Sequence, residues 1–446
     1  MTAPPRHRST PEVAAWAWIR AYRTELLVFG VSFLAFACFS GPRFLRQSAA
    51  PHFVYQAKAF LDGRLDLDPQ TLPNLEDWAC VREVGGVKSR CSGPPRTTDR
   101  WYVSFPAFPA VVMLPFVALH GWQFNDTSFG VILGALAVTL FYWLCRSLSA
   151  RGELHRTDPE AVFLAGVLGF GTLLFSCTIR GEVWFLAEVL GVVLTCLYVR
   201  AAVGARQPLL AGLLWSMATL TRTPLVFTGL FYLLEVLTPG PGARIPQLRA
   251  ALRTPRRWLR PVLLFAAGAA PLAILAMVFN WARFGSPGEF GHRFLYDNRV
   301  NADIDAHGLF SPVYLQRNLE AALLMLPRIQ WSPFRLGYDP RGLSLLVTMP
   351  WLVLLAFPRA RPRLHWPAWL TVALCALPGL FYQNTGYMQF GFRFSLDYTP
   401  YLVLLLGLSG WSFRKPLVQA LVGAALLVNT WGALAFRGYT ELVRRM

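Results

Sequence analysis

Long apolar stretches alternate with shorter charged ones along the whole chain, and this pattern predicts helices that cross a membrane. A helix needs about 20 apolar residues to cross the hydrocarbon core of a bilayer. Eleven stretches are candidates, although several are short: 25–41, 128–145, 160–178, 183–200, 208–220, 224–238, 261–280, 342–357, 366–382, 397–411 and 417–435. We therefore predict an all-α polytopic membrane protein, with about 11 transmembrane helices in a single domain, 1–446.

A long gap separates the first two clear spans, from Ser40 to Ser128. A transporter usually crosses the bilayer again after a short turn, whereas an enzyme acting on a lipid-linked substrate needs a platform at the membrane face. We therefore interpret residues 42–127 as a large first exterior loop that forms such a platform. A second large exterior loop is predicted at 281–341.

The arginines predict which loops are exterior. Four of them precede the first span: Arg6, Arg8, Arg20 and Arg23. The positive-inside rule then places the N-terminus in the cytoplasm. The segment Val103–His120 is apolar enough to cross, but its three prolines disfavour a regular helix. Five later basic loops all lie inside if it does not cross, so we expect it to enter the membrane or lie in the interface, which puts the C-terminus outside.

Charge and motifs narrow the function classes. Lys and Arg total 42 against 24 acidic residues, which gives a net charge of +18. Because the basic residues gather in short loops, we interpret them as a topology signal and expect no nucleic-acid partner. The sequence contains no Walker loop, dinucleotide-binding glycine fingerprint or paired CxxC motif, which argues against an ATP-driven pump.

The first loop contains the turn signal Gly85-Gly86 between two cysteines. Folding the chain about these glycines places Cys80 opposite Cys91. Directly opposed residues lie about 4.5 to 5.5 Å apart at their Cα atoms, within reach of a disulfide. We therefore predict a small hairpin closed by a disulfide, which indicates an oxidising compartment such as a periplasm.

Each exterior loop is also predicted to carry an interfacial helix. In the first loop, His52 to Asp62 form a short amphipathic helix that stops at Gly63. In the second, Ser311 and Pro312 start a helix. Its apolar stripe comprises Leu315, Leu319, Ala322, Leu323 and Leu326. Six arginines surround that helix, which suits a phosphate ligand or, for most of them, anionic lipid headgroups: Arg293, Arg299, Arg317, Arg328, Arg335 and Arg341.

Three local motifs stand in an order that resembles a known superfamily. They are YQAKAFLDG at 55–63, LTRTP at 220–224 and FGFRFSLD at 390–397. Together with the predicted topology, which covers most of the chain, they resemble the GT-C superfamily of membrane glycosyltransferases. Within it, the resemblance is to the aminoarabinose-transferase and protein O-mannosyltransferase branch.

This resemblance implies transfer of a sugar from a polyprenyl-phosphate-linked donor to an exterior lipid, glycan or protein acceptor. Such transfer is a single displacement, in which a carboxylate removes the proton of the acceptor while the lipid phosphate departs. A multi-pass protein of a bacterial inner membrane is implied too, surrounded by membrane lipids and with its active face in the periplasm. Some relatives use a divalent metal ion, so that cofactor is left open.

Two candidate catalytic residues follow from the resemblance. The acid that the family places beyond the third span has its counterpart in Glu182, which either acts in catalysis or is an anchor paired with Arg180. The acid of the first loop is absent, and His52 stands at the matching positions with Pro51. Either His52 replaces it as base or metal ligand, or it caps a helix and another acid supplies the charge: Asp62, Asp66, Asp68 or Asp99.

Six residues are candidates for substrate binding: Tyr55, Arg180, Arg222, Arg293, Arg393 and Asp397. Ionisable groups within a bilayer are costly and therefore tend to be paired or functional. Arg393 and Asp397 are four residues apart, which suits a helical ion pair. Holding the donor phosphate is the alternative role for Arg222 and Arg393.

Two other function classes stand beside the glycosyltransferase. A lipid-linked sugar flippase or other transporter predicts paired charges along a central path and internal repeats, and we find no convincing repeat in the sequence. A non-catalytic relative that binds a lipid-linked glycan for a partner enzyme is favoured by the missing acid of the first loop.

Overall fold

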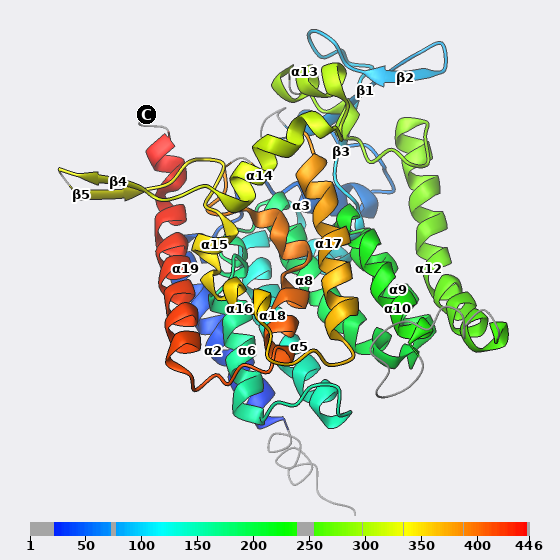
Figure 1. The fold of residues 1–446 in the computed structure, drawn as a ribbon. Coiled ribbons are helices and arrows are strands. Elements are labelled where there is room, and N and C mark those ends of the chain that lie inside the picture. The colour runs from blue at the N-terminus through cyan, green and yellow to red at the C-terminus, as the bar shows by residue number, and fades with distance from the viewer. Residues whose placement is uncertain are drawn as a thin grey trace, which may run out of the picture.

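The computed structural model describes residues 22–72, 77–238, 254–296, 298–332, 334–386 and 388–443. The chain forms a helical bundle, and its largest loops gather at one end (Figure 1). We call this the platform end, because residues 42–127 lie there. Arg6, Arg8 and Arg20, which orient the chain in the sequence-based prediction, lie outside the described residues.

Five helices among these residues are long and apolar enough to cross a membrane, so the chain is a multi-pass membrane protein. They are α2 (Arg23–Ser40) with η1 (Gly41–Leu45), α5 (Asp126–Ala150), α8 (Val183–Ala202) with η3 (Val203–Ala205), α12 (Pro255–Phe284) and α19 (Pro416–Val443). The apolar window of α8 is 89% buried, whereas those of α2 and α12 are each 17% buried. Helix α8 is therefore central, and α2 and α12 turn apolar side chains toward the surface that lipid covers.

The other candidate spans are shorter. They comprise α6 (Asp158–Phe170), α7 (Leu174–Thr178), α9 (Pro208–Thr219), η4 (Thr223–Thr228), α10 (Gly229–Leu237), α15 (Leu345–Thr348), η7 (Pro350–Leu352), α16 (Val353–Ala356), α17 (His365–Phe381) and α18 (Thr399–Leu408). The predicted span 342–357 is broken, because Met349 precedes a proline and leaves helical geometry (φ −136°, ψ 62°). The count of about 11 spans is thus confirmed only for the five long helices.

The platform contains a small sheet as well as helices. Its elements are α3 (His52–Leu61), β1 (Trp78–Val84), β2 (Val87–Arg90), β3 (Arg100–Val103), α4 (Phe108–His120) and η2 (Gly121–Gln123). The strands are antiparallel in the order β2-β1-β3. Gly85 and Gly86 make the turn with φ of 59° and 81°, which favours glycine. A disulfide joins Cys80 to Cys91, whose Cα atoms lie 5.4 Å apart, so the predicted hairpin and its disulfide are confirmed.

The platform begins and ends at the same end of the bundle. The Asn125 side chain donates to the Phe44 carbonyl (2.8 Å), and Ser48 donates its N–H and hydroxyl to Asp126 (2.7 and 2.6 Å). The end of α2 therefore lies beside the start of α5, which agrees with the prediction that 103–120 does not cross. The expectation of an irregular segment was wrong, since α4 continues through Pro115. Its 13 residues extend about 20 Å, less than a bilayer core.

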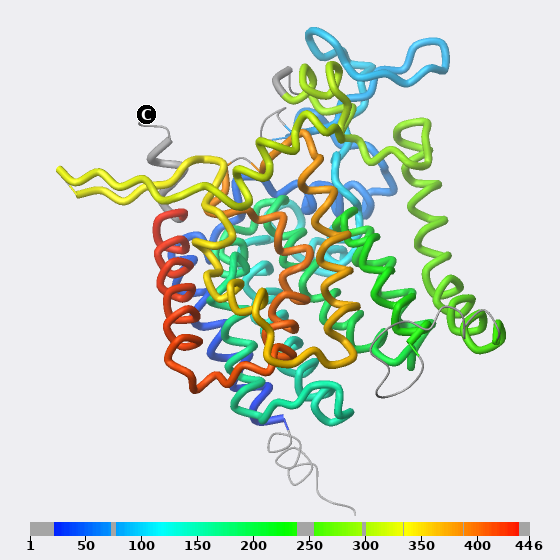
Figure 2. The backbone as a smooth tube through the Cα atoms, viewed as in Figure 1, coloured from blue at the N-terminus to red at the C-terminus, as the bar shows by residue number. Residues whose placement is uncertain are grey.

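The second large loop lies at the platform end too (Figure 1). It carries η5 (His292–Phe294), α13 (Asn298–His307), η6 (Pro312–Tyr314), α14 (Leu315–Leu323), β4 (Arg328–Trp331) and β5 (Phe334–Gly337). Ion pairing and hydrogen bonding join it to the platform: Arg90 pairs with Asp305 (2.6 Å), and Lys88 Nζ donates to the carbonyl of Ala282 (2.5 Å). The traces of the two loops accordingly lie together above the bundle (Figure 2).

The helix predicted after Ser311 is present, and the Ser311 hydroxyl accepts a backbone N–H two residues later (3.4 Å). The predicted apolar stripe was wrong in part. Helix α14 ends at Leu323, and both Leu323 and Leu326 are exposed. The inward face is built around Asn318, whose side chain donates to the carbonyls of Leu380 and Tyr382 (3.0 and 2.7 Å). This polar contact with the end of α17 sets the rotation of α14.

Glycines hold α12 against α9. A Cβ atom on Gly212 would lie 1.9 Å from the carbonyl oxygen of Phe265, and one on Gly268 would lie 2.0 Å from that of Leu209. Small residues allow such close approach between helices in a membrane. This close contact joins α12 to the bundle, although most of its apolar window is not buried.

Adding one methyl group at this contact is expected to separate the two helices. We predict that Gly212→Ala lowers the free energy of unfolding in detergent by about 1 to 3 kcal/mol, because the new Cβ meets backbone. Gly166→Ala is the matched control, since a Cβ there has no atom within 4 Å. Thermal unfolding of both purified variants measures the difference, and equal stability would contradict the close contact.

Candidate functional site

A cavity of about 1380 Å³ lies between the platform, the second loop and the helix bundle. Its wall includes these ionisable residues: His52, Asp77, Arg180, Glu182, Arg222, Glu289, His292, Arg293, Arg393 and Asp397. Both predicted catalytic residues, His52 and Glu182, are among them, and so are all the predicted substrate-binding residues except Tyr55. Segments far apart in the chain thus bring the predicted residues to one place.

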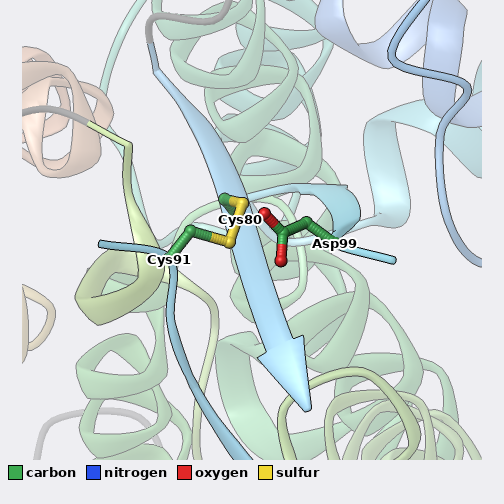
Figure 3. Close-up of side chains that lie close together, drawn as sticks. All are labelled: Cys80, Cys91 and Asp99. Atoms are coloured by element: carbon green, nitrogen blue, oxygen red, sulfur yellow. A yellow bond between two sulfur atoms is a disulfide. The ribbon is translucent and has the colours of Figure 1, made fainter. Parts of the chain in front are cut away.

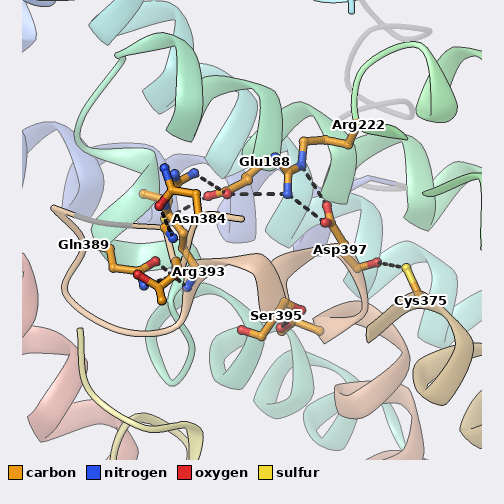
Figure 4. Close-up of polar contacts among 12 residues, drawn as sticks. Glu188, Arg222, Cys375, Asn384, Gln389, Arg393, Ser395 and Asp397 are labelled. Carbon is orange, nitrogen blue, oxygen red and sulfur yellow. Dashed lines mark hydrogen bonds and ion pairs between the residues drawn. The ribbon is translucent and has the colours of Figure 1, made fainter. Parts of the chain in front are cut away.

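Ion pairs link three segments in the wall of the cavity (Figure 4). Arg222, which precedes η4, donates to both carboxylate oxygens of Asp397 (2.9 and 2.7 Å) and lies 3.7 Å from Glu188 of α8. Glu188 also accepts a hydrogen bond from Arg393 (2.7 Å). The thiol of Cys375 on α17 donates to the backbone carbonyl of Asp397 (3.8 Å). The four charged side chains form one continuous chain of alternating sign.

The predicted ion pair between Arg393 and Asp397 was wrong. These residues bound a 3-10 helix, η8 (Arg393–Asp397). With about 3 residues per turn, side chains four apart do not share a face. Each residue instead pairs with a charge on another segment. Glu188 was not among the predicted site residues, although a carboxylate within an apolar helix was the signal that could have found it.

One hydrogen-bond donor of the Arg393 side chain has no partner among the described residues. Its backbone N–H donates to the side-chain oxygen of Gln389 (3.1 Å), and its Nη1 is taken by Glu188. Its buried Nε has no hydrogen-bond partner among the described residues. A buried donor without a partner costs free energy that an acceptor oxygen of a ligand would recover.

Glu182 stands directly before α8, and Arg180 holds it. The Nε and Nη2 atoms of Arg180 donate to the two carboxylate oxygens of Glu182 (3.1 and 2.8 Å), and Nη1 donates to the carbonyl of Phe436 (3.0 Å). Between them, Gly181 has φ 81° and packs so closely on Thr127 that a Cβ would lie 2.6 Å from the Thr127 Cα. The anchoring ion pair is therefore present, and both of its side chains also face the cavity.

His52 begins α3 and is buried against Trp78, with ring centroids 3.8 Å apart and nearly parallel planes. This burial lowers the pKa of His52 to about 3, so the imidazole is neutral at physiological pH. In this environment His52 is therefore not a base that titrates near neutral pH. Tyr55, one turn later, packs on Trp78 and Trp122 (5.8 and 4.8 Å between ring centroids) and does not line the cavity.

The four acids proposed to replace the missing carboxylate do not line the cavity. Three sit in surface contacts: Asp62 pairs with Lys58, Asp66 lies 3.5 Å from Arg64, and Asp68 accepts from a backbone N–H in a turn. Asp99 is buried and paired with Arg82, as described below.

Asp77, also an acid of the first loop, does line the cavity, and it is not among the residues predicted from the sequence. It is half-buried and adopts φ 60°, a conformation that costs free energy for a residue other than glycine. Its neighbour Trp78 starts β1 and stacks on His52. The sequence does show an acid directly before the strand that contains Cys80. That this acid reaches the cavity becomes clear only from the folded sheet, which fixes the direction of the chain there.

Asp99 lies beside the disulfide of the hairpin (Figure 3). It accepts hydrogen bonds from Arg82 Nε and Nη2 (2.8 and 2.7 Å), which hold the pKa of Asp99 below its usual value. Within the part of the chain that the structure describes, Cys80, Cys91 and Asp99 are the one group of three His, Cys or acidic side chains close enough to share a metal ion. Because the two sulfurs are bonded to each other, they are not thiolate ligands.

Most arginines of the second loop already have carboxylate partners. Arg328 pairs with Asp339, which Arg341 also contacts (3.1 Å), and Arg317 lies 3.7 Å from Asp303. A phosphate-binding cluster is therefore not formed by these arginines. Arg293 is different, because it lines the cavity with a side chain that is 67% exposed. The side chain of Arg299 lies outside the described residues.

The similarity of this chain to known proteins is limited. No family model matches the sequence, and no curated protein matches it. Among solved structures, the chain is similar to ArnT from Cupriavidus metallidurans, whose crystal structure contains undecaprenyl phosphate, with 13% sequence identity and a TM-score of 0.45. The match covers 92% of this chain and 63% of that one, so this chain spans less than two thirds of the length of that protein.

Removing the charge of Glu188 is expected to destabilise the fold. Glu188→Gln leaves Arg393 without its buried counter-charge and Arg222 with Asp397 alone, and we predict a loss of about 3 to 5 kcal/mol in unfolding free energy. Asp62→Asn breaks the exposed pair with Lys58 and should cost less than about 1 kcal/mol. Denaturation in detergent compares the two, and similar losses would argue against a special role for the buried chain.

His52 should make the fold sensitive to acid. Its pKa of about 3 in the folded chain lies below the value of about 6.5 in an unfolded chain, so the unfolded state binds more protons between these pH values. Stability is therefore lost as the pH falls through this window. We predict that unfolding of His52→Gln depends less on pH between about 6.5 and 4 than unfolding of the parent. His155→Gln, which removes a histidine at an exposed site, is the matched control variant.

Proposed function

We propose that this chain is an exterior-facing membrane glycosyltransferase of GT-C architecture. It would transfer a sugar from a polyprenyl-phosphate-linked donor to a lipid, glycan or protein acceptor. One observation carries the proposal: one large cavity is lined both by charged side chains and by exposed apolar ones. A lipid-linked sugar is a ligand of this mixed kind.

The apolar side of the cavity suits the isoprenoid chain of the donor. Val226 and Phe227 of η4 and Leu377 of α17 line the cavity, and all three are exposed. A chain lying there would bury apolar surface on protein and lipid together. The sugar and phosphate would then lie toward the platform.

The charged side suits one phosphate. The guanidinium groups of Arg180, Arg222 and Arg393 are each neutralised by a carboxylate, so they attract an anion mainly through remaining donors such as Nε of Arg393. Arg293 contributes a cation with a weak partner, Glu289, at 3.9 Å. These groups would stabilise the charge that develops on the departing lipid phosphate.

We assign the role of general base to Asp77. In the proposed displacement, an acceptor oxygen attacks the anomeric carbon, the bond from that carbon to the phosphate oxygen breaks, and its electron pair leaves on the lipid phosphate. Asp77 takes the acceptor proton. It suits this role better than His52, which is buried with its pKa lowered to about 3, because Asp77 lines the cavity and is only half-buried.

A second candidate function is movement of a lipid-linked sugar across the membrane. The observation that favours it is the chain of buried ion pairs from Asp397 to Arg393, because a transporter is expected to pair charges along its central path. A third candidate function is that of a non-catalytic protein, which binds the same lipid-linked glycan without transferring its sugar.

An assay with purified protein, radiolabelled polyprenyl-phosphate sugars and candidate acceptors separates these functions. We predict that Asp77→Asn lowers transfer by at least about 100-fold while donor binding is retained, because the variant lacks only the base. Asp62→Asn, another acid of the same loop, should transfer normally. Glu182→Gln is expected to be slow as well, through displacement of Arg180.

Normal transfer by Asp77→Asn would remove that residue from the mechanism. Donor binding by the parent protein without transfer to any acceptor would support the non-catalytic reading. Transfer of labelled donor from one leaflet to the other in liposomes, without a glycosylated product, would support the flippase.

A further inference from the structure

The hairpin of β4 and β5 is amphipathic across its width. The antiparallel register pairs Ile329 with Leu336 and Trp331 with Phe334. Opposed residues share a face, and alternate residues along a strand do too, so these four apolar side chains form one face. Arg335 lies on the other face, opposite Gln330.

The apolar face is not covered by any described part of the chain. Trp331 is 77% exposed, Phe334 65%, Ile329 50% and Leu336 41%. The chain between α14 and the hairpin also exposes apolar side chains, those of Leu324 and Leu326. An exposed apolar surface of this size on a defined element marks an interaction site.

The base of the hairpin is anchored on α19. Tyr338, directly after β5, packs edge-on against Trp431 of α19 (5.8 Å between ring centroids). Asp339 is buried and binds Arg328 at the start of β4 as well as Arg341. The hairpin therefore leaves the bundle at a fixed point and projects sideways past the platform end of α19 (Figures 1 and 2).

That point lies at the edge of the surface that lipid covers. Leu427 and Leu434 of α19 are exposed on the outside of the bundle, in a helix long and apolar enough to cross the membrane. An apolar ribbon projecting from the end of such a helix meets the boundary between headgroups and acyl chains. Aromatic residues favour this boundary, and arginine favours the phosphates above it.

We propose that this hairpin, residues 328–337 without residue 333, is a membrane-interface anchor that lies on the leaflet at the platform end. Its face of Ile329, Trp331, Phe334 and Leu336 rests on the acyl chains, and Arg335 points to anionic headgroups. The bilayer supplies the covering that a two-stranded ribbon lacks in water, where such ribbons are barely stable. The proposal does not depend on the catalytic activity.

The register of the hairpin supplies the test. Cysteine is introduced at Phe334 on the apolar face, or at Gln330 on the polar face, in full-length protein carrying Cys38→Ser. The other free cysteines are buried, so a bimane maleimide reports on the new site. The protein is placed in nanodiscs of phosphatidylcholine and phosphatidylglycerol, with nitroxides on the acyl chains near the headgroup.

We expect the lipid nitroxide to quench the label at Phe334→Cys at least about twofold more than the label at Gln330→Cys. Iodide in the buffer should show the opposite preference. Replacing phosphatidylglycerol by phosphatidylcholine should weaken the difference, because Arg335 loses its anionic contact.

Equal quenching by iodide at the two sites would overturn the proposal and would favour a protein partner as the natural cover. Thermal unfolding of each labelled protein serves as the folding control, and both sites are exposed enough for the label to leave the fold unchanged. Loss of glycosyl transfer without loss of lipid contact would bear on the proposed function and leave the anchor intact.

Discussion

The burial of the Glu188 carboxylate in the second turn of α8 is the constraint on which the arrangement of the cavity depends. A charge placed among apolar helices is costly unless cations meet it. Arg222 and Arg393 do so from segments that are not regular α-helix, the connection before η4 and the 3-10 helix η8. Because Arg222 also holds Asp397, one buried carboxylate organises both sides of the wall.

Local patterns predicted the local parts of this fold. The glycine pair between Cys80 and Cys91 was enough for the hairpin and its disulfide, since turn chemistry and register act over a few residues. The long helices α5 and α8 followed from apolar length alone. Pairing partners did not follow, because Arg393 could be matched with a neighbour in sequence but not with a glutamate 205 residues away.

The candidate site, like the fold, could be predicted from the sequence only in part. Composition and resemblance brought Glu182, Arg222 and Arg393 forward, and they do share one cavity. Asp77 was missed because its place in the cavity wall depends on the turn into β1, whose backbone conformation could not be predicted from the sequence. Burial reverses the chemistry expected of His52, since an imidazole stacked on Trp78 prefers to stay neutral. Environment, more than residue type, decides which of these groups can act.

The contacts between the two large loops have a consequence for biosynthesis. Lys88 binds the carbonyl of a residue 194 positions later, and Arg90 binds one 215 positions later. At about 5 to 20 residues per second, a ribosome takes about 10 to 40 s to make the intervening chain. During this time the hairpin is held by contacts within the first loop: its disulfide, the pairing of β1 with β3 and the ion pair of Arg82 with Asp99. The sheet of the first loop is therefore complete in itself before the second loop joins it.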